Sequence, residues 1–116
     1  MNCSGQSDHQ FPTEDALAAK LSALSHPARL AILRHLSMRG CSCCKDVVDT
    51  VDLAQSTVSQ HLKVLKEAGL ISFRRDGVRS SYVLNPAAFA ALHSDLEDIL
   101  ALVAAPKNGA AIREAG

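Results

Sequence analysis

The sequence predicts a mainly α-helical fold with a small β-hairpin. Residues 55–68 repeat apolar side chains on one face of a helix, at Val58, Leu62 and Leu65. Gly69 follows as a helix stop, and two short alternating apolar runs then flank Asp76-Gly77, which is a strong hairpin signal. A helix with one polar face, a glycine stop and a hairpin in this order are typical of a winged helix-turn-helix.

The chain has 116 residues, which predicts one principal domain. Its formal net charge is +0, so it lacks the overall positive charge of many nucleic-acid binders. The charge is nevertheless uneven, because basic side chains exceed acidic ones between Ala54 and Tyr82, whereas Asp95, Glu97 and Asp98 are the only formal charges between 86 and 104. This polarity indicates a protein that meets DNA on one side.

Compartment and catalysis are constrained by what the sequence omits. No apolar run approaches the roughly 20 residues that cross a bilayer, and MNCSGQSDHQ lacks a hydrophobic signal core, so we expect a cytoplasmic protein with no membrane partner. No histidine or carboxylate is placed as base and orienter for the cysteines, and no glycine loop could cradle phosphate. We therefore do not expect an enzyme.

The N-terminal part divides into an arm and a first helix. Residues 1–12 mix polar residues, glycine and proline without a period, and predict a flexible arm that carries Cys3. The domain is expected to span 13–105, starting with Thr13 as the cap of a helix whose apolar stripe is Leu17, Leu21 and Leu24. Residues 106–116 predict a frayed tail.

Two further helices are expected before the polar one. Pro27 starts the first of them, with Leu30, Ile32, Leu33 and Leu36 turned inward and His35 on the surface, and it ends near Gly40. Residues 44–51 form the second, with Val47, Val48 and Val51 inward. The tight turn 52–54 then completes a helix-turn-helix.

A last helix is predicted from Pro86 onward. Its apolar residues recur at spacings of three and four, at Phe89, Leu92, Leu96, Ile99 and Val103. This heptad-like seam, with alanines beside it, favours contact with a partner helix.

The polar helix and the hairpin predict a division of labour on DNA. Short polar and amide side chains at the start of a recognition helix can contact base edges, whereas arginines near a hairpin tip can contact phosphate or a minor groove. The candidate DNA-binding residues are Gln55, Ser56, Thr57, Ser59, Gln60, His61 and Lys63 on the helix, and Arg74, Arg75 and Arg79 on the hairpin.

The CSCC run predicts a thiol site. Reduced thiols at Cys41, Cys43 and Cys44, with Cys3 on the arm, fit ligand or redox chemistry better than structural disulfides. Soft thiolates select zinc, cadmium, lead or arsenite-type ions. Cys41 and Cys43 can converge only if the residues before Cys44 are not helical. Thiol oxidation or persulfidation is the main alternative, and cysteines without a sensing role are the other.

With these residues in view, the chain resembles the ArsR/SmtB family of bacterial metal-sensing regulators. The resemblance covers about residues 15–103, and it is carried by LSHPARLAILRHL, LAQSTVSQHLKVLKEAGLI and FRRDGVRSSYVL. It implies a homodimer paired through the first and last helices, a pseudo-palindromic double-stranded DNA operator, and release on binding an inducer. Arsenite, antimonite, cadmium, lead or zinc on a Cys-x-Cys site is the implied effector.

Two other functions are compatible with the same fold. One is a repressor that responds to thiol redox agents or persulfide. The other is a winged-helix module that binds proteins, in which the basic hairpin is only a solvated edge. The glutamine, serine and threonine side chains on the polar helix favour DNA.

Overall fold

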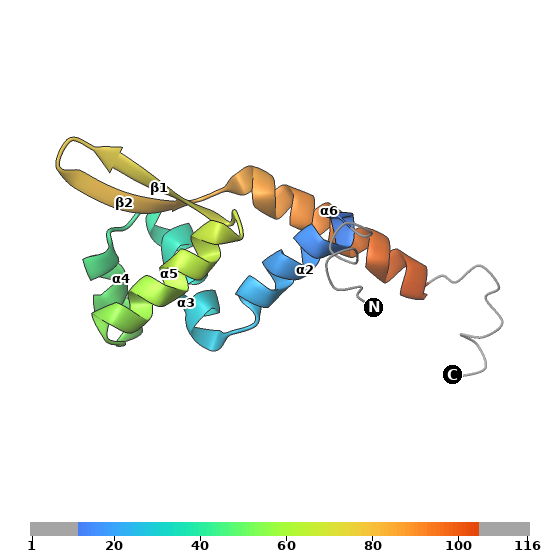
Figure 1. Cartoon of the computed structure of the whole chain (residues 1–116), viewed down its shortest axis with the longest axis horizontal. Helices are drawn as coiled ribbons and strands as arrows, with labels where there is room; N and C mark the ends of the chain where they lie inside the picture. The colour runs from blue at the N-terminus through green and yellow to red at the C-terminus, as the bar shows by residue number, and fades with distance from the viewer. Residues whose placement is uncertain (1–11, 105–116) are drawn as a thin grey trace, which may run out of the picture.

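The computed structural model describes residues 12–104 and confirms the mainly α winged helix-turn-helix. In Figure 1, α3, α4 and α5 pack together beside the hairpin, while α2 and α6 lie side by side and extend away from it. The elements are α2 (Pro12–Leu24), α3 (Pro27–Arg39), α4 (Cys44–Val51), α5 (Gln55–Glu67), β1 (Ile71–Asp76), β2 (Arg79–Leu84) and α6 (Pro86–Ala104).

The first two helices differ in how they begin. Helix α2 begins at Pro12, so Thr13 lies inside the helix rather than capping it. His26 caps α3, because its Nδ1 accepts a hydrogen bond of 3.0 Å from the Ala28 N–H. Gly40 ends α3 with a φ of 84°, a conformation that glycine adopts without strain.

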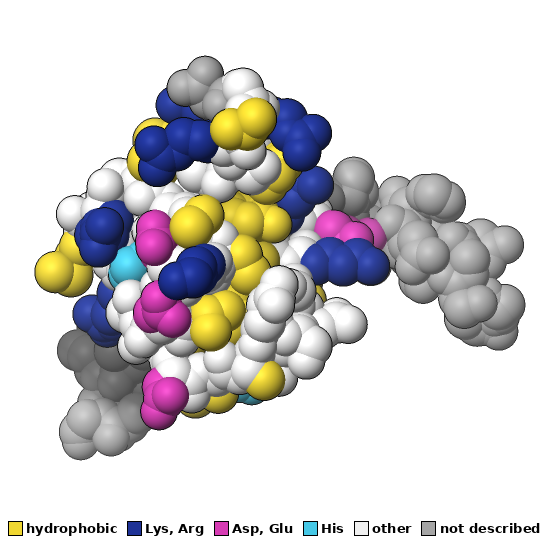
Figure 2. Space-filling model, turned by 90° about the vertical axis from the view of Figure 1, so that its left-hand side faces the viewer, with side chains coloured by type: hydrophobic (Ala, Val, Ile, Leu, Met, Phe, Trp, Pro, Cys, Tyr) yellow, Lys and Arg dark blue, Asp and Glu magenta, His cyan; other side chains and the backbone are white. Residues whose placement is uncertain are grey.

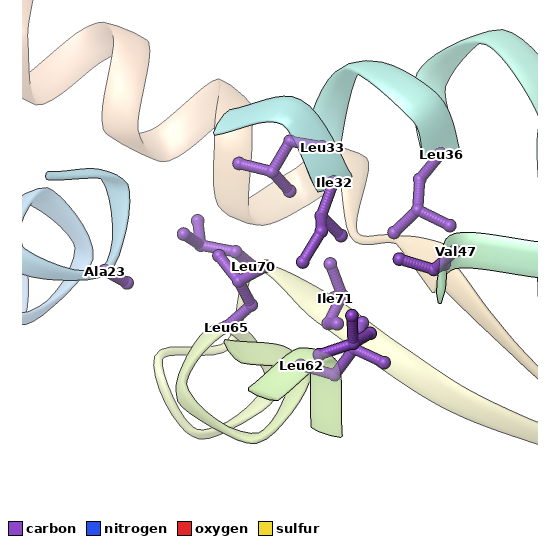
Figure 3. Packing of buried hydrophobic residues seen from close by; sticks show 10 residues of the cluster. Ala23, Ile32, Leu33, Leu36, Val47, Leu62, Leu65, Leu70 and Ile71 are labelled. Carbon is purple, nitrogen blue, oxygen red and sulfur yellow. The ribbon is translucent and has the colours of Figure 1, made fainter. Parts of the chain in front are cut away.

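The core lies where α3, α4, α5 and the start of β1 meet (Figure 3). As predicted, α5 buries its apolar stripe and α4 buries Val47. Leu30 is the exception, since it remains 42% exposed and does not join the inward face of α3. The clustered core residues are Ala23, Ile32, Leu33, Leu36, Val47, Val58, Leu62, Leu65, Leu70 and Ile71.

The hairpin is present as predicted, and it has a two-residue loop. Asp76 pairs with Arg79, so Gly77 and Val78 form the turn. Gly77 has a φ of 66° at the first loop position, where tight hairpins favour glycine. Ser42 makes an isolated antiparallel bridge to β2, because its N–H donates to the Tyr82 carbonyl at 3.1 Å and its carbonyl accepts from the Tyr82 N–H at 2.8 Å.

Helix α6 leaves the C-terminal part of its apolar seam uncovered in this single chain. Leu92 is buried at 5% exposure, whereas Ile99 is 42% and Val103 is 65% exposed. Leu21 of α2, from the predicted stripe, is also 37% exposed. None of the helices between residues 12 and 104 has the length and apolar character needed to cross a membrane.

Candidate nucleic-acid interface and thiol segment

The polar face of α5 is open along its length. Val58, Leu62 and Leu65 hold the opposite face in the core, which fixes the rotation of the helix. Thr57 is exposed, and a shallow hollow of about 460 Å³ is lined by five of the predicted residues, Gln55, Ser56, Ser59, Gln60 and Lys63. The structure therefore brings most of the predicted helix residues onto one accessible surface.

The hairpin carries the second set of predicted DNA-binding residues. Arg74, Arg75 and Arg79 are all exposed. Figure 2 shows basic side chains gathered over the upper part of the face that carries the hairpin, with acidic and further basic side chains below them. Although the formal charge of the chain is +0, this end of the molecule offers a positively charged edge to an anionic partner.

His61 differs from the other predicted helix residues, because its ring is engaged inside the domain. Its Nδ1 lies 3.2 Å from Arg29 Nη1, and its ring centroid is 4.5 Å from that of His26. Burial lowers the pKa of His61 below its ordinary value, and the nearby His26 and Arg29 lower it further. A DNA contact by His61 remains a prediction.

Arg29 is a structural residue whose role the sequence did not reveal. Its Nε donates to the Ala23 carbonyl at 2.6 Å and its Nη2 donates to the Ser22 carbonyl at 3.3 Å, so it satisfies carbonyls at the end of α2. Through His61 it also contacts α5. Its position in the first turn of α3 indicated that it lies near the end of α2, but the sequence spacing did not predict which groups it binds.

Cys41 and Cys43 lie on one side of an extended segment. Residues two apart in a strand share a face, so the two cysteines point away from the buried Ser42 between them. Both line an open hollow of about 510 Å³ against the hairpin, together with Ser42, Asp46, Arg74, Arg79, Ser80 and Ser81. The predicted condition for their convergence is met, because α4 begins only at Cys44.

Cys44 lies apart from that hollow and next to the polar helix. Its Sγ is 3.8 Å from the Ser59 Oγ of α5. It is also near Tyr82, whose pKa is raised first by burial and then by the neighbouring Cys44. Cys41, Cys43 and Cys44 are free thiols. Their soft donor chemistry suits a soft ion, but no group of three or more possible ligands is gathered within residues 12–104. Cys3 lies outside the described residues.

His35 corrects the prediction that placed it on the surface. It is 8% exposed and Ser42 is 3% exposed, and the His35 Nε2 and the Ser42 Oγ are 2.7 Å apart. The hydrogen bond satisfies both polar groups inside the core, and this explains why α3 can turn a histidine inward. The signal in the sequence was spacing, since His35 follows Ile32 by three positions on the buried face.

Comparisons with known proteins agree with this architecture. A helix-turn-helix domain family matches residues 24–72. The chain is 35% identical over 82 residues to the HTH-type transcriptional regulator YgaV of Escherichia coli (strain K12), across 71% of this chain and 83% of that protein. It is 39% identical over 66 residues to the arsenical resistance operon repressor of Bacillus subtilis (strain 168), across 57% of this chain and 63%, less than two thirds, of that repressor.

Solved structures give the same result. An ArsR-like transcriptional regulator from Rhodococcus sp. RHA1 superposes with a TM-score of 0.77 at 25% sequence identity. The match covers 90% of this chain and 96% of that one, so it includes the hairpin and both terminal helices as well as the helix-turn-helix.

Proposed function

We propose that this chain, which belongs to the ArsR/SmtB family of winged helix-turn-helix transcriptional regulators, is a repressor that a soft ion releases from DNA. DNA-binding regulation of transcription, and not enzymatic catalysis, is the function of the family. The proposal adds a homodimer, a pseudo-palindromic double-stranded operator, a cytoplasmic site of action and a thiol-bound inducer.

One observation carries the DNA assignment. The polar face of α5 and the arginines of the hairpin are both exposed to solvent, because neither packs into the core. Gln55, Ser56, Thr57, Ser59 and Gln60 are assigned to base edges in the major groove, where each good bidentate contact contributes about 1–3 kcal/mol of discrimination. We assign contacts with the DNA phosphate backbone to Lys63, Arg74, Arg75 and Arg79. His61 is assigned to the margin of the contact between α5 and DNA.

The exposed apolar surface supports the homodimer. Ile99 and Val103 of the predicted seam share a face of α6 and are 42% and 65% exposed, and Leu21 on α2 is 37% exposed. Large exposed apolar side chains on one helix face are typical of a protein interface. A twofold pair through α2 and α6 would place two α5 helices for half-sites about one turn of DNA apart, which is about 34 Å.

The effector assignment is supported by the thiol chemistry and by the relatives. Cys41, Cys43 and Cys44, with Cys3, are the proposed ligands for arsenite, antimonite, cadmium, lead or zinc. The B. subtilis relative is named for arsenical resistance, and a 33% identical Staphylococcus aureus relative is named for cadmium resistance. When bound, such an ion supplies a cross-link between thiolates. The chain supplies their placement between α5 and the hairpin.

The test is release from DNA under reducing conditions. A labelled duplex from upstream of the coding region is bound at low salt, and each ion is titrated while fluorescence anisotropy is followed. Operator affinity should fall about 5- to 150-fold with one of the ions, as for typical couplings of about 1–3 kcal/mol. The variant Cys43→Ser/Cys44→Ser should bind DNA but show neither release nor thiolate-to-metal absorption, and Cys3→Ser tests the arm.

The other outcomes are equally informative. Release by persulfide or peroxide but by no ion would assign the thiols to the redox alternative. Release by neither would leave the cysteines without a sensing role, and no sequence-specific DNA binding at all would favour the protein-interaction module.

A further inference from the structure

We infer that the hollow between the Cys41–Cys43 segment and the hairpin is a modification site for small disulfides that carry carboxylate groups. The inference goes beyond ion-triggered release, because it assigns a reaction with disulfides to two of the same thiols, and only its consequence for DNA binding rests on the proposed function. The hollow measures about 510 Å³, a size typical of sites that take small molecules.

The register of the short sheet aligns a thiol with an arginine. Ser42 bridges Tyr82 in antiparallel fashion, so Cys43 comes beside Ser81, and Ser81 pairs with Arg74 on β1. Arg79 lies two residues from Ser81 and therefore on the same face. Neighbouring strands are about 5 Å apart, so a ligand attached to the thiol needs to span only two strands to reach the Arg74 guanidinium.

The lining of the hollow selects a chemical class. Arg74 and Arg79 can bind carboxylates bidentately, and the hydroxyls of Ser80 and Ser81 add hydrogen bonds. Asp46 is the only acidic side chain in this lining, and it suits an ammonium group. Two arginines and one aspartate together fit an amino-acid-type half-disulfide, which carries carboxylates and one ammonium.

The reaction is thiol–disulfide exchange. The thiolate of Cys41 or Cys43 attacks one sulfur of the disulfide, the old S–S bond breaks and a new S–S bond to the protein forms. The other half leaves as a thiolate and takes up the proton lost by the cysteine. The cysteine is oxidised, the disulfide is reduced to one thiol, and no other oxidant is needed.

The position of the adduct gives it a regulatory consequence. Its carboxylates would occupy Arg74 and Arg79, which are two of the arginines assigned to DNA phosphate. The modification therefore acts on the hairpin directly and competes with DNA. Cys44 lies on the other side, beside Ser59, and does not share this route.

The test measures exchange rates on the free full-length protein with Cys3→Ser and Cys44→Ser, which leaves only the two thiols in question. Oxidised glutathione, cystamine and 2-hydroxyethyl disulfide are compared by mass spectrometry, and each rate is divided by the rate of the same disulfide with 2-mercaptoethanol. The carboxylate-bearing disulfide should react about tenfold faster than the neutral one at low salt, within the range that local charge gives to encounter rates.

Substitution of the arginines decides the origin of this preference. Arg74→Gln/Arg79→Gln should reduce it to less than about twofold, as should high salt. Arg75→Gln removes one positive charge from β1 at a residue outside the lining, and should keep the preference. Equal normalised rates for all three disulfides, or equal losses in Arg75→Gln, would overturn the inference. Because no DNA or ion is present, its failure is distinguishable from failure of ion-triggered release.

Discussion

Substitution of Ser42 tests whether the thiol segment, residues 41–44, is anchored to the core through His35. In Ser42→Ala the hydroxyl is lost, and the His35 Nε2 that lay 2.7 Å from it has no partner. Both residues are buried, at 3% and 8% exposure, so water cannot replace the bond without opening the core. The backbone hydrogen bonds between Ser42 and Tyr82 are untouched by this change.

The expected cost follows from that geometry. A buried polar group left without its partner lowers the free energy of unfolding by about 1–3 kcal/mol. For a domain of this size, each kcal/mol corresponds to a fall in Tm of about 4–8 °C. The matched control is Ser37→Ala on α3, because the Ser37 hydroxyl is exposed and bonds only within its own helix, to the Arg34 carbonyl. Its effect should stay within about 0.5 kcal/mol.

Thermal and urea unfolding followed by circular dichroism provide the measurement, at one protein concentration because a dimer makes Tm depend on concentration. His35→Leu and the double variant His35→Leu/Ser42→Ala complete a cycle. Since the double variant leaves no orphaned polar group, it should be less destabilised than the two single changes added together. A Ser42→Ala protein as stable as Ser37→Ala, or additive changes in the cycle, would refute the anchoring role.

Three further predictions concern the surfaces. Ile99→Glu should yield monomers in sedimentation at micromolar concentration, because a charge at a residue 42% exposed in one chain would become buried and unpaired in the dimer, whereas Ser94→Glu should stay dimeric. Arg75→Ala should weaken operator and random DNA alike and flatten the salt slope by about one, whereas Gln60→Ala should mainly lower the ratio between them; equal behaviour would contradict the assignment. The folded pKa of His61 is lowered below 6.5, so the unfolded chain takes up the proton first and stability falls as the pH drops from about 6.5 towards the lowered value. Tm against pH should decline less over that window in His61→Gln, and an unchanged decline would show that other groups cause it.

The fold was predictable from the sequence because local signals and long-range packing agree. The period of α5 specifies its buried face, Pro27 specifies the start of α3, Gly40 and Gly69 follow helix ends, and Gly77 specifies a tight turn. The hairpin itself was predictable, but its two loop residues were not, because Asp76-Gly77 and Gly77-Val78 both put a glycine in a tight turn. Only the pairing of Asp76 with Arg79 distinguishes them, and pairing is not a local property.

The site was predictable only in part, because its residues meet across elements. The period of α3 allowed His35 to be inside, but a buried histidine requires a partner, and Ser42 lies in a different segment. The CSCC run predicted one thiol cluster. Cys43 is extended and Cys44 starts α4, so their thiols have different neighbours. Leu30 was expected inside because it is apolar, although burial depends on which neighbours cover it.

The thiols lie next to two different elements that are assigned to DNA, so a ligand bound to them could affect DNA binding through direct contacts. Ser42 is hydrogen-bonded to β2, and Cys44 lies against Ser59 of α5, so the thiol segment contacts both elements assigned to DNA. No chain of intermediate residues is required, and the coupling equals the difference in ligand affinity between the two conformations. A ligand on Cys41 or Cys43 would act first on the hairpin and its phosphate contacts, whereas one on Cys44 would act first on base readout. The salt dependence of the residual DNA binding therefore separates the two routes, because only loss of phosphate contacts lowers the salt slope.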